Sequence, residues 1–389
     1  MPYNFDELID RRGRPGSHKW NFYPEDVIPM WIADMDFRAP NVVLNALREK
    51  VEHGILGYEQ ASDELIQVVC ERMQRLYNWR VTPQQIIVVP GLVTGINAVA
   101  RALCQPGDGV LMHTPVYSPF LEVPKNQNLV KQTTPFICIS DGRTLHYEID
   151  FDAFEAAISD YTRLYLLCHP HNPIGKTFSR AELTRLGEIC LRHNAIICSD
   201  EIHAELLLDD NPHTPLAAVS PEIAARTVTL IAASKTFNTA GLFCSFIIVP
   251  DADIRQKIIA ATEGTVPWVN AMGLAAALAA FRDDPDTNEW HTSLLQYLKA
   301  NRDTLVDYVT TRLPDIKTTV PQATYLAWLD CRDAKLGDPF EFFMQKAKVA
   351  LSDGIAFGPG GEGFVRLNFG CPRSRLLEAL DRMKAALSQ

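Results

Sequence analysis

The chain has 389 residues, of which 47% are hydrophobic, so it can bury a large core and is too long for one ordinary single-core domain. Its 37 basic and 47 acidic residues give a net charge of −10, which argues against nucleic acid and acidic membrane surfaces as partners. Nine cysteines without any C-x-x-C pair indicate reduced thiols. Because the amino terminus is polar and acidic and no stretch reaches the ~20 apolar residues of a membrane span, we expect a soluble cytoplasmic protein.

Residues 1–45 show little periodicity, and from about residue 85 the pattern becomes regular. Short β-branched runs then alternate with helical periodicity, which predicts a parallel sheet covered by helices. The runs are fully apolar, as expected for strands that are buried on both faces. The predicted strands span 86–89, 110–116, 164–168, 195–199, 228–233 and 245–249, and the predicted helices span 91–103 and 180–193.

The last hundred residues follow a different pattern. An Ala-rich segment at 271–281 precedes a long helical pattern at 287–313 that could bridge two domains. Strand, helix, strand and helix follow at 325–330, 340–349, 364–369 and 376–387. We therefore divide the chain into a segment 1–45 that packs with the small domain or a dimer partner, a large domain 46–286 and a small α+β domain 287–389.

Polar motifs follow four of the predicted strands. Ser234 and Lys235 come after one strand, Asp200 after another and Asn172 after a third, while the turn Gly91–Gly95 joins a strand to a helix. A lone lysine of this kind would ordinarily be a surface loop residue. Because the carboxyl ends of parallel strands share one edge of a sheet, these motifs together predict a ligand site.

In this order and spacing, the motifs resemble the fold-type I pyridoxal-5′-phosphate (PLP) enzymes of the aminotransferase class I/II superfamily, over essentially the whole chain. Four segments are similar to the MalY/PatB group of cystathionine β-lyases, the cysteine C-S lyases: 31–37, 200–203, 234–238 and 365–370. The resemblance implies the aspartate aminotransferase-like fold, with a mostly parallel seven-stranded sheet in the large domain. It also implies PLP as the cofactor, an amino-acid substrate, and a homodimer with active sites at the interface.

The resemblance assigns catalytic roles to Lys235, Asp200 and Tyr117. Lys235 would hold the cofactor as a Schiff base and later take the substrate Cα proton. Asp200 would keep the pyridine nitrogen protonated, because PLP withdraws electrons well only in that form. Tyr117 would stack on the ring, although it could also be an ordinary core aromatic.

Further residues are expected to bind the cofactor or the substrate. The cofactor set adds Val93, Thr94, Asn172, His203, Ser234 and, from the neighbouring subunit, Tyr58. The substrate set is Arg366, Asn172, Ala33 and Tyr58. Arg366 could instead form a structural ion pair, and His203 could be a core histidine.

Several positions depart from the superfamily pattern. His203 stands where aminotransferases usually carry tyrosine, which favours the C-S lyase group. Phe243 replaces a common phosphate-binding arginine and Ala232 a common serine, so the phosphate must depend on the amides of Val93 and Thr94, Ser234 and Tyr58. No metal site is expected at the closely spaced His169 and His171, because no carboxylate or cysteine stands at ligand spacing.

Three functions remain open from the sequence. The first is β-elimination from cystathionine or another S-substituted L-cysteine to thiol, pyruvate and ammonia, because thiolates leave readily when the thiol pKa is near ~8.5. The second is an aminotransferase of an unidentified amino acid. The third is a PLP-binding regulatory protein with residual lyase activity, which the presence of Lys235, Asp200 and Arg366 together argues against as a sole function.

Overall fold

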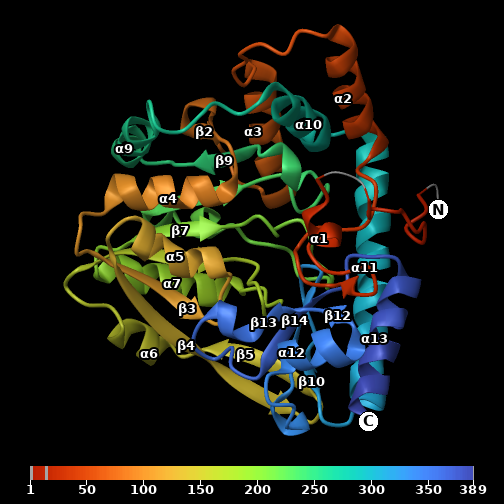
Figure 1. Ribbon diagram of the computed structural model, residues 1–389. Coiled ribbons are helices and arrows are strands. Elements are labelled where there is room, and N and C mark those ends of the chain that lie inside the picture. Colours follow the sequence, from red (N-terminus) through yellow and green to blue (C-terminus); the bar gives the residue numbers. More distant parts are fainter. Residues whose placement is uncertain (1–2, 14–15, 389) are drawn as a thin grey trace.

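The structure is a computed structural model that describes residues 3–13 and 16–388. Within these residues, seven neighbouring strands form a sheet in the order β4-β3-β6-β7-β8-β9-β2 (Figure 1). Their bounds are β2 (Ile86–Val89), β3 (Gly109–Thr114), β4 (Val130–Asp141), β6 (Thr162–Cys168), β7 (Ile196–Asp200), β8 (Thr227–Ile231) and β9 (Ser245–Ile248). Neighbours from β4 to β8 pair in parallel, whereas β9 is antiparallel to β8 and β2. The predicted α/β class with a mostly parallel sheet is confirmed.

Helices cover both faces of this sheet. They are α4 (Leu92–Leu103), α5 (Ser118–Asn126), α6 (Phe151–Ala156), α7 (Arg180–Arg192), α8 (Pro221–Ala224) and α9 (Ala252–Thr262). Along β6, Leu164 and Leu166 enter the core under α4, α5 and α9, whereas Tyr165 and Leu167 enter the core under α6, α7 and α8. Successive side chains of a strand point to opposite faces, so the fully apolar run of β6 fits a strand buried on both sides.

The long strand β4 extends the sheet into a second group of strands. Their bounds are β5 (Thr144–Ile149), β10 (Lys317–Thr319), β11 (Leu326–Asp330), β13 (Ser352–Asp353) and β14 (Phe364–Asn368). The first half of β4 pairs with β3 and the second half forms an antiparallel hairpin with β5, from which the ladder continues through β10, β11, β14 and β13. The sequence analysis does not predict this hairpin, because many residues of β4 are exposed and form no apolar run.

A 28-residue helix, α11 (Pro285–Arg312), runs along one side of the molecule beside α13 (Arg373–Leu387) (Figure 1). The carboxylate of Asp284 caps its first turn by accepting the backbone N–H groups of Asp286 and Thr287. Three more helices share its core: α2 (Asn41–His53), α3 (Asp63–Tyr77) and α10 (Ala271–Phe281). No helix in residues 3–13 and 16–388 combines the length and hydrophobicity that crossing a membrane requires.

The amino-terminal segment contains α1 (His18–Asn21) and β1 (Ile28–Pro29). β1 pairs in parallel with β12 (Val349–Ala350), and the ring of Phe5 packs on Trp290 and Tyr297 of α11. The helix predicted at 340–349 is wrong at its end: α12 (Pro339–Phe342) passes into a π-helical turn at Phe343–Ala347, and the chain then enters β12. The division at residues 45 and 286 stays a prediction, since one ladder of strands runs across both larger parts.

Candidate active site

The polar residues at the ends of the strands lie around one cavity of about 170 Å³. Asp200 is the last residue of β7, Asn172 follows β6, Lys235 follows β8, and α4 begins directly after β2. The parallel strands end at the same edge of the sheet, which brings these residues together. The cavity is lined by Ala33, Pro90, Gly91, Leu92, Val93, Thr94, Tyr117, Cys168, Asn172, Asp200, Ile202, His203, Ser234, Lys235, Ala240 and Phe243.

Lys235 points from the end of β8 toward the segment that covers the cavity. Its Nζ donates to the backbone oxygen of Ala33 at 2.6 Å. Burial, together with the positive charge of Arg366, lowers the pKa of Lys235 to about 8. A larger share of this amine is therefore neutral near physiological pH than in an exposed lysine, and a neutral amine can act as a nucleophile or a base.

Asp200 is buried at 3% exposure and has no ion pair among the described residues. One of its carboxylate oxygens accepts the backbone N–H of Ile202 at 3.1 Å. Burial raises the pKa of Asp200 to about 7, although the N–H of Ile202 and the charge of Lys235 act in the opposite direction. A buried carboxylate that lacks a cation is costly, so this position is suited to a positively charged ligand atom.

Arg366, on β14, is a buried cation at 5% exposure. Its guanidinium donates to Asn172 Oδ1 at 2.9 Å, to the backbone oxygen of Trp31 at 2.8 Å and to Ser352 Oγ at 3.1 Å. Its Nε is buried and has no hydrogen-bond partner in the described chain. Arg366 also forms no ion pair with any described residue. The structural ion pair that the sequence left open is therefore absent from the described residues, and the guanidinium remains available to an anion.

The amino terminus of α4 forms another wall of the cavity. Its N-cap residue Gly91 has φ of 97° and provides no side-chain cap, so the first N–H groups of the helix, those of Val93 and Thr94 among them, face the cavity region without a capping side chain. The exposed ring of Phe243 lies against Gly91, and a Cβ added at Gly91 would lie 3.1 Å from it. An aromatic ring, not an arginine, thus flanks this helix terminus.

Two further predicted residues lie in the same cavity. Tyr117 is partly buried at the N-cap of α5, and its backbone N–H donates to the oxygen of Asn172 at 3.0 Å. His203 is buried, its Nδ1 has no partner in the described chain, and burial lowers its pKa to about 3. The neutral imidazole can therefore donate a hydrogen bond from one nitrogen while it accepts at the other.

A single chain does not bring Tyr58 into the cavity, and Arg366 is joined to the cavity wall by its hydrogen bond to Asn172. Tyr58 is 95% exposed, and its ring packs edge-on against Trp268 at 6.0 Å. His169 and His171, which the sequence analysis excludes as metal ligands, hydrogen-bond backbone oxygens: His169 that of Thr214, and His171 those of Cys168 and Pro115.

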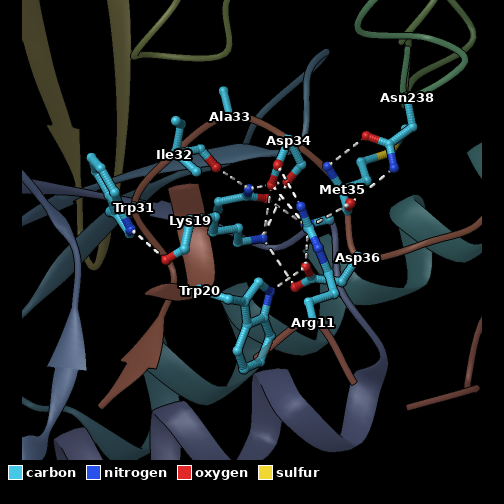
Figure 2. A network of polar contacts seen from close by, with 12 residues as sticks. Arg11, Lys19, Trp20, Trp31, Ile32, Ala33, Asp34, Met35, Asp36 and Asn238 are labelled. Carbon is cyan, nitrogen blue, oxygen red and sulfur yellow. Dashed lines mark hydrogen bonds and ion pairs between the residues drawn. The ribbon is translucent and has the colours of Figure 1, made fainter. Parts of the chain in front are cut away.

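Residues 31–37, here called the cover segment, contribute Ala33 to the wall of the cavity, where its backbone oxygen accepts from Lys235 Nζ. Distant side chains hold its backbone oxygens: Tyr325 donates to Ala33 at 3.1 Å, and Asn368 donates to Ile32 at 2.6 Å and to Asp34 at 2.7 Å. Asn238 accepts from the N–H of Met35 and donates to the oxygens of Met35 and Phe37 (Figure 2). The position of Ala33 beside Lys235 therefore depends on contacts from far along the chain.

A buried charge network lies behind the cover segment. Figure 2 shows the ammonium of Lys19, which is 1% exposed, between the carboxylates of Asp34 and Asp36. Lys19 Nζ lies 3.0 Å from Asp36 and 3.4 Å from Asp34, while Arg11 bonds the same two carboxylates at 2.6 and 2.9 Å. Burial opposes the charge of Lys19, but Asp36 and Asp34 outweigh it and raise its pKa. The paired charges fix the fold of the segment.

Four residues of the site are not predicted from the sequence: Tyr325, Asn368, Lys19 and Arg11. Asn368 lies within the segment 365–370, where a polar amide in an apolar strand is a usable signal. Tyr325 precedes the apolar run of β11, and Lys19 lies in a segment without periodicity; neither pattern distinguishes a buried polar contact from an exposed one.

The arrangement agrees with comparisons to known proteins. A family model for aminotransferase class I and II matches residues 25–383. Cystathionine beta-lyase PatB of Bacillus subtilis (strain 168) is 40% identical over 99% of this chain and 100% of its own. Among solved structures, cystalysin from Treponema denticola, which contains a pyridoxal 5′-phosphate cofactor, has a TM-score of 0.94 at 31% identity and covers 100% of this chain and 99% of its own.

A PLP-bound C-S lyase from Staphylococcus hominis has a TM-score of 0.92 at 30% identity, over 100% of this chain and 99% of that one. These matches cover nearly all of both chains in each comparison. The predicted resemblance is thereby confirmed. The chain belongs to the aminotransferase class I and II family, in the group that includes PatB.

Proposed function

We propose that this protein is a PLP-dependent lyase that cleaves the C–S bond of cystathionine or another S-substituted L-cysteine, giving thiol, pyruvate and ammonia. The observation that carries the proposal is a cavity that is lined by Lys235 and the unpaired Asp200, with the guanidinium of Arg366 hydrogen-bonded to Asn172 in its wall. The name of PatB and the PLP bound in the structure of cystalysin support this reaction and this cofactor.

The residues around the cavity fit PLP. The buried Asp200 carboxylate suits a protonated pyridine nitrogen, and the uncapped N–H groups of Val93 and Thr94, with Ser234, suit a phosphate. Asn172 and the unpartnered Nδ1 of His203 can meet the phenolic oxygen, and Tyr117 can stack on the ring. When bound, PLP supplies an electron-withdrawing ring that stabilises negative charge on the substrate Cα.

Side chains of the protein bind the substrate and transfer its proton. Lys235 attaches the cofactor and, once its amine is free, removes the proton from the substrate Cα, for which its lowered pKa of about 8 is well suited. Arg366 binds the α-carboxylate with Asn172 beside it, and the backbone of Ala33 positions the substrate from the other side. Loss of thiolate from Cβ needs little acid assistance, so the site requires no further strong acid.

We also propose that the active enzyme is a homodimer. The exposed large apolar side chains include Ile55, Leu56, Tyr58, Phe243 and Trp268. Leu56, Tyr58 and Trp268 line one wide cavity, and Asn270 at its edge hydrogen-bonds the oxygen of Leu242, next to Phe243 at the active site. An exposed apolar surface of this kind marks an interface, and a second copy here could bring its Tyr58 to the phosphate and the substrate.

The remaining expectations are also part of the proposal. The division of the chain is a segment 1–45 that packs with the small domain or the dimer partner, a large PLP-binding domain 46–286 and a small domain 287–389. We place the enzyme in the cytoplasm, in keeping with the nine free cysteines and the absence of disulfides in the described chain.

The decisive experiment is turnover of L-cystathionine without any added 2-oxo acid. The lyase should form pyruvate, ammonia and homocysteine in equal amounts over many turnovers. An aminotransferase would stop after one half-reaction until an acceptor is added, since its cofactor leaves that step in the amine form. Product that forms from cystathionine and other S-substituted cysteines only when a 2-oxo acid is present would replace the lyase proposal with the aminotransferase.

A further inference from the structure

A second cavity, here called the distal cavity, opens beside Arg366 and has a volume of about 320 Å³. Tyr117 lines both this cavity and the active-site cavity. Arg366, which lines the distal cavity, is hydrogen-bonded to Asn172 in the active-site cavity. A substrate whose α-carboxylate is bound by Arg366 therefore sits where the two cavities meet, with the distal cavity in reach of its side group.

Aromatic and aliphatic side chains dominate the walls of the distal cavity. They include Tyr23, Trp31, Phe340 and Leu351. Trp31 packs on Tyr23 at 5.5 Å and on the exposed ring of Phe22 at 5.1 Å, so the aromatic surface continues to the rim. A dry apolar cavity of roughly 150 Å³ already accepts benzene, so this space can hold a ring together with its linking methylene.

The charges around the distal cavity disfavour an acidic group. Within the described chain, Arg366 is the only arginine or lysine that lines the distal cavity. In the proposed complex, Arg366 is already bound to the α-carboxylate of the substrate. Asp353 also lines the cavity, and its carboxylate accepts the N–H of Ile355 at 3.1 Å. Glu341 is close enough that, after burial, its charge contributes to raising the pKa of Tyr23. A terminal carboxylate here would meet negative charge and no free cation.

We propose that the distal cavity selects S-substituted cysteines whose group on sulfur is bulky and apolar, above all aromatic, and that it discriminates against groups with a net negative charge. The group on the sulfur of cystathionine carries an ammonium beside its carboxylate and therefore has no net charge. This inference rests on the proposed lyase function and narrows its substrate class. The apolar walls favour the neutral ring by removing its surface from water. The negative charge of Asp353 disfavours a substrate carboxylate in the cavity by electrostatic repulsion.

The first test compares three thioethers with the cofactor-loaded enzyme: S-benzyl-, S-methyl- and S-(2-carboxyethyl)-L-cysteine. We expect kcat/KM for pyruvate formation to be at least about tenfold higher for the benzyl than for the methyl compound, the scale at which apolar pockets discriminate. The carboxyethyl compound should not exceed the methyl compound. A benzyl value equal to or below the methyl value would overturn the proposal.

Two variants test which residues are responsible. Phe340→Ala should lower the benzyl-to-methyl ratio of kcat/KM about tenfold, whereas Phe342→Ala, on the same short helix but outside the cavity lining, should leave the ratio as it is. Asp353→Asn keeps an acceptor for Ile355 and should raise the carboxyethyl-to-methyl ratio several-fold. Equal effects of the two phenylalanine variants would contradict the assignment.

Binding without C–S cleavage separates this inference from the lyase proposal. L-2-amino-5-phenylpentanoate and L-norvaline replace sulfur by carbon in the benzyl and methyl compounds, so neither can lose a thiolate. Calorimetry should give a Kd at least about tenfold lower for the phenyl compound, and Phe340→Ala should abolish the difference. If no thioether yields pyruvate but this difference is found, the lyase proposal fails and the cavity assignment stands; equal Kd values overturn the cavity assignment.

Discussion

The two walls of the active-site cavity are built in different ways. The sheet wall consists of Asn172, Asp200 and Lys235, each of which lies at the end of a buried strand or a few residues beyond it and makes few contacts with other polar groups. The cover segment, residues 31–37, has no regular structure and is held by polar side chains from across the chain, Asn238 and Asn368 among them. The sheet wall therefore presents reactive side chains that have few polar partners, whereas hydrogen bonds from distant side chains stabilise the cover segment.

This difference predicts different consequences for mutation. Substitutions in the sheet wall should lower the reaction rate and leave the protein folded, because these side chains make few contacts on which the fold depends. Changes behind the cover segment should reduce stability or substrate affinity, because they leave buried polar groups unpaired.

The largest effect is expected for Lys235→Ala. The variant should lose cofactor that can be fixed by borohydride, and kcat should fall by several orders of magnitude, since no other amine lines the cavity in the described chain. Mass spectrometry after borohydride treatment measures the covalent adduct. Lys176→Ala, at a salt bridge with Glu182, serves as the control. An adduct that persists in Lys235→Ala would refute the assignment.

Asp200→Asn should be next in size. The amide keeps the shape of the carboxylate but cannot hold a proton on the ring nitrogen, so we expect kcat to fall by about 10²- to 10³-fold while cofactor stays bound. Absorbance of the bound cofactor and steady-state rates measure the two effects separately. Turnover close to that of the wild type would show that Asp200 has no electronic role.

Lys19→Met tests the charge network behind the cover segment. Removing a buried cation between two carboxylates should lower the free energy of unfolding by about 3–5 kcal/mol. Arg38→Met breaks an exposed pair with Glu7 and should cost less than about 1 kcal/mol. Denaturant unfolding of both variants measures the difference. Similar losses in the two would mean that the buried network does not stabilise the segment.

A smaller effect is expected for the pH dependence of the stability of the cofactor-free protein. Burial raises the folded pKa of Asp200 to about 7, above the value of about 3.9 in an unfolded chain. The stability that Asp200 contributes is therefore fully present below about pH 4 and is lost as the pH rises toward about 7. Asp200→Asn lacks this loss, so its melting temperature relative to the wild type should increase between pH 5 and 7. A constant difference over this range would contradict the raised pKa.

The smallest effect is expected for Asn238→Gly, which removes three hydrogen bonds to the cover segment. Glycine suits the φ of 55° at this position, so the backbone can stay as it is. KM should rise about tenfold with a much smaller change in kcat, because Ala33 is less well positioned for substrate binding. Asn78→Gly, at φ of 50° on the end of α3, is the matched control. A fall in kcat with unchanged KM would point to a role in the chemical step.

The sheet wall could be predicted because its positions follow from local pattern. An apolar run such as Leu164–Cys168 forms a buried strand, and the carboxyl ends of such strands lie at one edge of the sheet because the strands run parallel. Asp200, Asn172 and Lys235 could therefore be placed together before any contact was known. The hairpin of β4 and β5 could not, because its strands are partly exposed and lack an apolar run.

The sequence by itself determined the fold class, the order of the buried strands and the family, since these depend on periodicity and on motifs only a few residues long. Only the tertiary structure decided that Lys19 is buried between Asp34 and Asp36 and that Ala33 lies against Lys235. The physical reason is that a polar side chain looks the same in the sequence whether it is solvated or buried. Its energy depends on partners that folding brings from tens to hundreds of residues away.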